Sequence, residues 1–374
     1  MSIADFNEAI EQFRVFAEKE IGLFALDADL EPSNALVKTI WRKSESLGMP
    51  ALPFPESAGG RGYPDFCLAL LLDVVSAACP GMASVYAHHY AACLSFLNAD
   101  ADQLTRFLTD ERNVRLSGTP ICAMLFPKKE GEEKLSLKSR NGDLSLSGVS
   151  SLTGNVHFAD KFFVFAKDGD LDGGLTCLMV DAGKKGVSIS RTKHFSGLKL
   201  NPMAEVTLGD VSVSPEDIVG IRGRGGKILE ESLLSFHNFL AAMIMGAVRN
   251  ALKKAFDYAE DRYQFGAQII HHQEIQKILR RMMLKLNQGT SAYIKMFENP
   301  SKERPSSLEE TLSIRKQCKS YACEIIMDAL KIENDTIHVN QYGLDKIIRD
   351  VVTLAIIDRG EKPHPAERLH RKVG

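Results

Sequence analysis

The sequence predicts an α+β protein with three parts: an N-terminal helical domain over residues 1–115, a β-barrel-like domain over 116–219 and a C-terminal four-helix bundle over 220–374. Two observations lead to this prediction. Apolar residues recur every three or four positions towards both ends of the chain, which is the spacing of an amphipathic helix. Between these regions, short alternating or β-branched runs are divided by turn-forming residues, as is typical of strands.

The N-terminal region shows the helical spacing near its beginning and again before residue 50. A segment rich in glycine and proline, residues 53–64, interrupts it, so we expect several separate helices. The apolar positions that define the pattern are Phe6, Ile10, Phe13, Phe16, Ile40, Trp41 and Leu47.

The middle region contains a strong hairpin signal. Asn141-Gly142 lies between the alternating runs 135–139 and 144–148, and this dipeptide suits a two-residue turn in which both residues have positive φ. Further runs at 162–165 and 187–189 also read as strands.

The C-terminal region regains helical periodicity after residue 226 and keeps it to about residue 357, with a break at 299–305. Its long apolar faces predict packing into a four-helix arrangement and favour oligomerisation. One such face is formed by Leu279, Met282, Met283 and Leu286, and we interpret its methionines as core residues.

Composition excludes several classes of function. The 374 residues are 44% hydrophobic and 25% charged, which is enough to bury large cores, and the net charge of −2 gives no bulk attraction for nucleic acid or for a membrane surface. The N-terminus carries acids where a signal peptide needs basic residues. The longest apolar run, residues 239–248, is half of the ~20 residues that span a bilayer.

The seven cysteines are odd in number, scattered and never spaced as CxxC, so neither a disulfide framework nor a zinc site is predicted. A reducing, cytoplasmic location fits this usage best. The paired histidines His88-His89 and His271-His272 have no Asp, Glu or Cys partner at ligand spacing by our reading, so we predict no metal.

The most informative segment runs from Arg262 to Gln273 and opens a long apolar-periodic helix. The Arg262 guanidinium could clamp a pyrophosphate through two hydrogen bonds, and Phe265 offers an aromatic face to a purine. Gly266 lets the backbone approach a ligand, and Gln273 could bond its polar edges. The alternative is an Arg262 that only pairs with a neighbouring acid, Glu260 or Asp261, on a solvated helix end.

Four segments, taken in order, resemble the acyl-CoA dehydrogenase family over nearly the whole chain. The first segment, residues 48–62, contains the string Pro55-Glu56-Ser57-Ala58-Gly59-Gly60-Arg61-Gly62. The second runs from Gly197 to Gly220, where the chain leaves the β region. The third contains Arg262, Phe265, Gly266 and Gln273, and the fourth ends in Arg349-Asp350.

The resemblance implies an FAD-dependent oxidoreductase of fatty acid metabolism that removes hydrogens from Cα and Cβ of an acyl-CoA thioester. In the family a Glu follows the Arg-Asp pair as the base, and the same spacing here gives Asp358. The Arg262 block would contact a flavin bound chiefly by a neighbouring subunit. A homo- or hetero-oligomer, dimer or tetramer, is therefore implied, with an electron-transfer flavoprotein as a common acceptor.

Asp358 also has a purely structural interpretation, as a surface acid paired with Arg359 near a helix end. Asp is one methylene shorter than Glu, and a neighbouring Arg would keep it ionised and less basic. Some family members place the base on an earlier helix instead. The nearest equivalent here is Phe236, followed by His237, so that variant is not predicted.

Four departures from the family pattern affect the flavin site. The Trp-x-Thr that covers the flavin face falls on Leu152-Thr153-Gly154, and the Thr-Glu-Pro loop has no clear counterpart in residues 116–124. The Gly-Gly-x-Gly near the ADP part falls on residues 334–337, where Asp335 would repel a pyrophosphate, and the Thr after the base becomes Gly360.

Three hypotheses follow. The chain could be a divergent dehydrogenase that uses Asp358 and binds FAD with altered contacts. It could instead be a catalytically degenerate subunit that lends Arg262, Phe265 and Gln273 to the FAD of a paralogous partner. A third possibility is a non-catalytic acyl-CoA-binding or structural protein.

Overall fold

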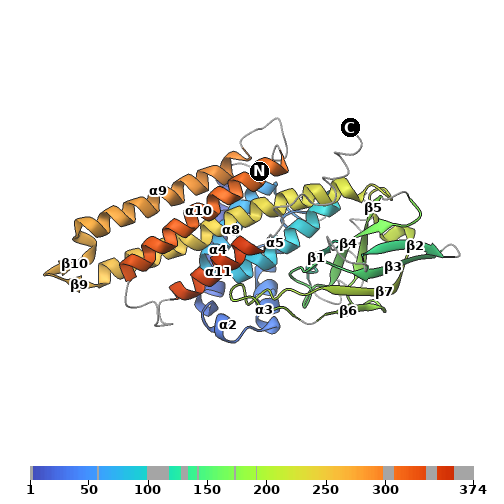
Figure 1. The fold of residues 1–374 in the computed structure, drawn as a ribbon, viewed down its shortest axis with the longest axis horizontal. Helices are drawn as coiled ribbons and strands as arrows, with labels where there is room; N and C mark the ends of the chain where they lie inside the picture. The colour runs from blue at the N-terminus through green and yellow to red at the C-terminus, as the bar shows by residue number, and fades with distance from the viewer. Residues whose placement is uncertain are drawn as a thin grey trace.

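A computed structural model describes residues 3–56, 59–98, 118–127, 134–140, 143–171, 174–190, 192–297, 307–333 and 343–357. The α+β architecture predicted from the sequence is confirmed: N-terminal helices, a middle β domain and a C-terminal helical domain follow one another along the chain. Figure 1 shows long helices packed lengthwise in one part of the molecule and the sheet at one end. The predicted boundary at 115/116 lies outside the described residues.

The N-terminal helices form where the periodic pattern predicts them. Ser33 caps the third of them by accepting the Ala35 N–H at 3.2 Å, and the inward positions Val37, Ile40 and Trp41 are buried. The helices are α1 (Ile3–Phe16), α2 (Asp27–Leu30), α3 (Asn34–Glu45), α4 (Asp65–Ala78) and α5 (Pro80–Leu94).

The β domain is one eight-stranded sheet in the order β6-β7-β3-β2-β4-β5-β8, with β1 pairing in parallel with β4. Arg140 lies opposite Asp143 in the antiparallel pair β2–β3, so the hairpin predicted around residues 141–142 is confirmed by the strands that flank it. The strands are β1 (Cys122–Leu125), β2 (Ser136–Arg140), β3 (Asp143–Val149), β4 (Lys161–Asp168), β5 (Leu175–Asp181), β6 (Val187–Ile189), β7 (Val206–Val213) and β8 (Ile218–Val219).

The C-terminal helices surround a single long one. The 37-residue α8 (Gly225–Asp261) packs against α9 (Gln273–Lys295), α10 (Leu308–Glu333) and α11 (Leu344–Ile356), and also against α4 and α5 (Figure 1). By length and composition α8 could cross a membrane, but 89% of its most apolar window is buried inside the protein. Its apolar side chains therefore form the core of this helical assembly.

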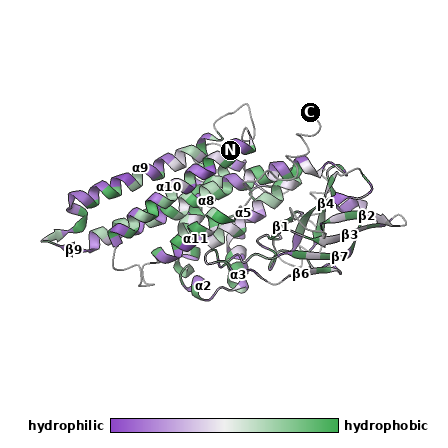
Figure 2. Cartoon of the chain, in the orientation of Figure 1, coloured by the Kyte–Doolittle hydropathy of each residue, from purple (hydrophilic) through white to green (hydrophobic). Residues whose placement is uncertain are grey.

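Three apolar clusters hold the molecule together. The largest joins the N-terminal and C-terminal helices, a second fills the sheet, and a third lies where α5 and α8 meet the strands. Figure 2 shows the hydrophobic residues concentrated along the inner helices and many hydrophilic residues along α9. The partly buried Phe236 of α8 packs against both the largest and the third cluster, so it marks the junction of helices and sheet.

Candidate active site

The segment Arg262 to Gln273 forms a corner between two helices. Arg262 caps the C-terminal end of α8, and the chain then makes a hairpin of β9 (Tyr263–Gln264) and β10 (Ala267–Gln268) before α9 begins at Gln273. Phe265 and Gly266 form the turn with φ of 51° and 84°. The extended backbone of Arg262 (φ −81°, ψ 121°) ends α8, and the left-handed pair turns the hairpin, so of the predicted binding residues only Gln273 lies on a long helix.

The side chains of this corner face outwards. The Phe265 ring is 96% exposed, and no atom would lie within 4 Å of a Cβ added at Gly266. The Arg262 guanidinium makes no hydrogen bond or ion pair with any residue in the described ranges, so the alternative pairing with Glu260 or Asp261 is not formed. Figure 1 places this corner, labelled β9 and β10, at the opposite end of the molecule from the sheet.

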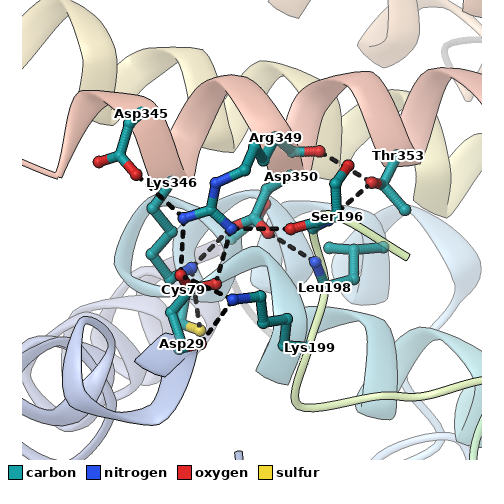
Figure 3. Close-up of polar contacts among 12 residues, drawn as sticks. Asp29, Cys79, Ser196, Leu198, Lys199, Asp345, Lys346, Arg349, Asp350 and Thr353 are labelled. Carbon is teal, nitrogen blue, oxygen red and sulfur yellow. Dashed lines mark hydrogen bonds and ion pairs between the residues drawn. The ribbon is translucent and has the colours of Figure 1, made fainter. Parts of the chain in front are cut away.

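The Arg349-Asp350 pair anchors α11 to two distant parts of the chain (Figure 3). Arg349 binds both carboxylate oxygens of Asp29 on α2, at 3.1 and 2.6 Å, and donates to the Ser196 carbonyl at 2.7 Å. The fully buried Asp350 accepts the Leu198 N–H at 2.6 Å and an ammonium hydrogen of Lys346 at 2.6 Å.

Charge and burial act against each other in this anchor. Burial alone would raise the pKa of Asp29, but the Arg349 guanidinium outweighs it and the pKa is lowered. Burial alone would likewise lower the pKa of Lys346, but Cys79 and the Asp350 carboxylate raise it. The charged forms of Asp29 and Lys346 are therefore favoured, and the family-like Arg-Asp motif has a structural role in this chain. Sequence reasoning did not identify Asp29 or Lys346.

The predicted base Asp358 lies outside the described residues, as do Arg359 and Gly360. The structure shows what holds the helix before it. The buried Arg315 of α10 donates to the Leu354 carbonyl near the end of α11 at 3.1 Å, and its other terminal nitrogen lies 3.0 Å from His237 Nδ1 on α8. The end of α11 is thereby tied to the segment of α8 that carries Phe236.

The position expected to cover the flavin face is closely packed. Thr153 exchanges backbone hydrogen bonds with Ala204, both at 3.1 Å. A Cβ on Gly154 would come within 2.7 to 2.9 Å of the Asn201 amide and of His88 Nε2, so glycine is required there. The departures in residues 334–337 and 360 lie outside the described residues, as do residues 116–117 of the segment 116–124, whose remainder leads into β1.

One group of potential metal ligands exists in the described part of the chain. His89, Cys93 and Cys122 are buried with their ligand atoms within 4.8 Å of one another. Our reading that no Cys lies at ligand spacing was wrong, because Cys93 follows His89 by four residues, one helical turn. His89 Nδ1 faces the Cys122 N–H at 3.2 Å and Nε2 faces the Pro50 carbonyl at 2.9 Å. Both ring nitrogens are thus used by the backbone, which leaves no lone pair for a metal.

Comparison with known proteins identifies the fold and the family. The sequence matches the domain descriptions "Acyl-CoA dehydrogenase, N-terminal domain" over residues 4–110, "middle domain" over 129–211 and "C-terminal domain" over 223–362. A 3-(aryl)acrylate reductase of Clostridium sporogenes is 26% identical over 371 residues, covering 96% of each chain.

Two solved structures share the fold over almost the full length. The butyryl-CoA dehydrogenase of Megasphaera elsdenii superposes with a TM-score of 0.84 at 20% identity, covering 95% of both chains. The structure described as PigA with FAD and proline has a TM-score of 0.83 at 18% identity, covering 100% of this chain and 98% of that one. These two likenesses show the shared fold. The three matched domains, which together span most of the sequence, show that the chain belongs to the acyl-CoA dehydrogenase family.

Proposed function

We propose that this protein is an FAD-dependent dehydrogenase that removes hydrogens from Cα and Cβ of an acyl-CoA thioester, with Asp358 as the base. Membership of the family supports the reaction class and the cofactor. A cytoplasmic location and an electron-transfer flavoprotein as acceptor belong to the same proposal. The seven unpaired thiols are compatible with a reducing compartment.

The observation that carries the proposal is the outward-facing corner at the end of α8. Arg262, a cation without a described partner, precedes the almost fully exposed Phe265 ring by three residues, and the residue that follows the ring leaves room for a ligand. These groups fit the pyrophosphate and purine of FAD. Because the corner lies far from the β domain of its own chain, we propose that it holds the FAD of a second subunit (Figure 1).

The residues of this chain have separate tasks in the proposed reaction. Arg262, Phe265, Gly266 and Gln273 bind and orient the nucleotide, and the Arg349-Asp350 anchor together with Arg315 fixes the helix that leads to Asp358. Asp358 takes the proton from the α carbon. When bound, FAD supplies the acceptor for the hydride that leaves the β carbon.

A second candidate is the flavin-poor subunit of a hetero-oligomer. The observation that favours it is the contrast between the open corner at Phe265 and the closely packed Gly154, where His88 and Asn201 fill the space of any side chain. Such a chain would lend Arg262 to a partner's FAD and would not bind the cofactor alone.

FAD binding tests both candidates. We expect Arg262→Ala and Phe265→Ala to weaken FAD affinity by at least about tenfold, as loss of a charge-assisted contact would. The midpoint of thermal unfolding of the FAD-free protein should not change. Arg280→Ala is the matched control, because Arg280 is an exposed arginine on α9. Flavin absorbance of the protein purified alone supports the first candidate, and absorbance only after co-expression with a paralogous subunit supports the second. If neither preparation binds FAD, the oxidoreductase proposal is wrong.

The role of Asp358 is tested by exchange of the acyl α-hydrogens in D2O, followed by NMR. Asp358→Asn is expected to slow exchange by roughly 10² to 10⁴, the range of a general base. Asp358→Glu should retain most of the exchange because it restores the residue type of the family. Unchanged exchange in Asp358→Asn would remove this residue from the mechanism.

A further inference from the structure

A buried imidazole lies where the helices meet the sheet, and no part of the proposed mechanism uses it. His88 of α5 retains 7% of its exposure and packs edge-on against Phe236 of α8, with ring centroids 4.8 Å apart. Its Nε2 points to Gly154, 2.9 Å from the position of an added Cβ. Phe236, beside it, is itself only partly buried.

The surroundings of His88 determine which nitrogen carries the proton. Nδ1 lies 2.8 Å from the Ser84 carbonyl, which can only accept a hydrogen bond. This contact is shorter than the 3.3 Å that separates Nδ1 from Ser84 Oγ and from the Asn201 amide nitrogen, so we assign Nδ1 as the donor. The neutral ring therefore keeps its lone pair on Nε2. In the described part of the chain, Nε2 makes no hydrogen bond.

Burial keeps this imidazole neutral. It lowers the pKa of His88 to about 4, and the hydrogen bond to the Ser84 carbonyl only partly opposes the effect. At neutral pH the ring accepts a hydrogen bond at Nε2 and cannot donate one there.

The loop opposite His88 is held rigidly. Asn201 accepts the Asn155 N–H at 2.7 Å and donates to Ser84 Oγ at 2.9 Å. Asn155 is fully buried with φ of 66°, and its amide donates to the Val85 carbonyl at 2.9 Å and to the Cys122 carbonyl at 3.1 Å. A strained and buried backbone clamped from both sides is typical of a site that must keep its geometry.

The same contacts connect His88 to the end of α11. The Asn201 N–H donates to the Leu198 carbonyl at 2.8 Å, and Leu198 is itself bound by Asp350. From the other side, Phe236 precedes His237, which lies beside the Arg315 that holds the end of α11. His88 is therefore built into the framework that positions the segment leading to Asp358.

We propose that His88 Nε2 is a hydrogen-bond acceptor for the acyl group, and that it selects acyl thioesters carrying an O–H or N–H donor on the carbons next to the thioester. This inference rests on the proposed function. A plain alkyl chain would leave the buried lone pair unpaired, and a donor would satisfy it.

Binding of three probes to the holoenzyme, measured by calorimetry, tests the inference. Butanoyl-CoA is compared with 2-hydroxybutanoyl-CoA and 3-hydroxybutanoyl-CoA. We expect the wild type to bind one hydroxylated probe at least about tenfold more tightly. His88→Leu should abolish this preference, and His88→Gln, which keeps an acceptor, should retain part of it. His194→Leu, at an exposed histidine of the β domain, serves as the control and should keep the full preference.

Four further outcomes decide against the inference. If the wild type does not discriminate, or if folded His88→Leu discriminates as the wild type does, His88 does not select the acyl group, while dehydrogenation of butanoyl-CoA would leave the proposed function intact. If His88→Leu changes FAD affinity or the flavin spectrum but not the preference among probes, the acceptor faces the cofactor. Failure of all three probes to bind the wild type would overturn both proposals.

Discussion

Asp350 and Lys346 form an ion pair that solvent hardly reaches. Their side chains are 1% and 8% exposed, and the carboxylate also receives the Leu198 N–H. Removal of one partner leaves the other charge buried without compensation, which lowers the stability of the folded protein more than replacing both charges would. Each residue therefore needs the other, because either charge alone would be buried without a counter-charge.

Asp350→Ala should lower the free energy of unfolding by about 3–5 kcal/mol, the range for an orphaned buried charge. Denaturant unfolding followed by circular dichroism measures the change. The double variant Asp350→Leu with Lys346→Met should recover part of the loss, because both charges are then gone. A double variant as unstable as Asp350→Ala would mean that the backbone contact to Leu198 dominates.

His88 makes stability depend on pH in a defined window. The folded protein holds the ring with a pKa of about 4, whereas the unfolded chain protonates it near 6.5. The unfolded state therefore binds more protons between these values, and stability falls as pH falls from about 6.5 to about 4.

His88→Gln should make the plot of unfolding free energy against pH shallower in that window, by up to about 1.4 kcal/mol per pH unit for one proton. An unchanged slope in His88→Gln would show that the ring is not protonated differently in the two states.

At the scale of elements, α11 and the loop before β7 pack without space between them. A Cβ on Gly197 would lie 2.3 Å from the Arg349 carbonyl oxygen, and both partners are backbone, so neither could move alone. Thr353 reinforces the contact by accepting the Gly197 N–H at 3.1 Å.

Gly197→Ala should therefore destabilise the protein by roughly 1–3 kcal/mol, as overpacking does. Gly183→Ala is the control, because no atom lies within 4 Å of its added Cβ, and it should stay within about 0.5 kcal/mol of the wild type. Thermal unfolding monitored by circular dichroism distinguishes them. Equal midpoints would mean that the loop yields more readily than its hydrogen bonds indicate.

Local patterns in the sequence were sufficient for most elements. Periodicity predicted the helices, and Asn141-Gly142 predicted the β2–β3 hairpin, because both depend on residues close in the chain. The Arg262 block was expected to open a helix, but positive φ at Phe265 and Gly266 bends it into a hairpin. Because residues other than glycine rarely adopt positive φ, a phenylalanine at position 265 does not predict this turn.

At the scale of the whole molecule, sequence reasoning had no access to contacts between distant segments. Asp29 and Arg349 are separated by 320 residues, and no local pattern pairs them. The place of His88 depends on a glycine and an asparagine from two loops of the β domain. Such positions follow from packing of the three parts of the chain, which a periodic pattern does not encode.

A site shared between subunits predicts complementation. Asp358→Asn is expected to inactivate a homo-oligomer, and Arg262→Ala is expected to do so at an FAD concentration that leaves its weakened site largely empty. When the two variants are unfolded, mixed and refolded, mixed dimers would contain one site with both native residues. About a quarter of the wild-type activity per site should return if pairing is random. No recovery, although mixed dimers are seen by native mass spectrometry, would show that each chain completes its own site.

If the site is shared between subunits as proposed, the length of α8 sets the spacing between the β9–β10 corner and the sheet end of the same chain. Its 37 residues extend for about 55 Å at 1.5 Å each, from the edge of the sheet to the β9–β10 corner. The number of residues in α8 fixes both the distance and the direction of the corner. One inserted residue would rotate the corner by about 100° about the helix axis, whereas seven inserted residues would restore its direction but move it ~10 Å further along the axis. In the proposed twofold arrangement, Arg262 and Phe265 would then lie beyond the nucleotide, so the register of α8 would govern which subunits could share a cofactor.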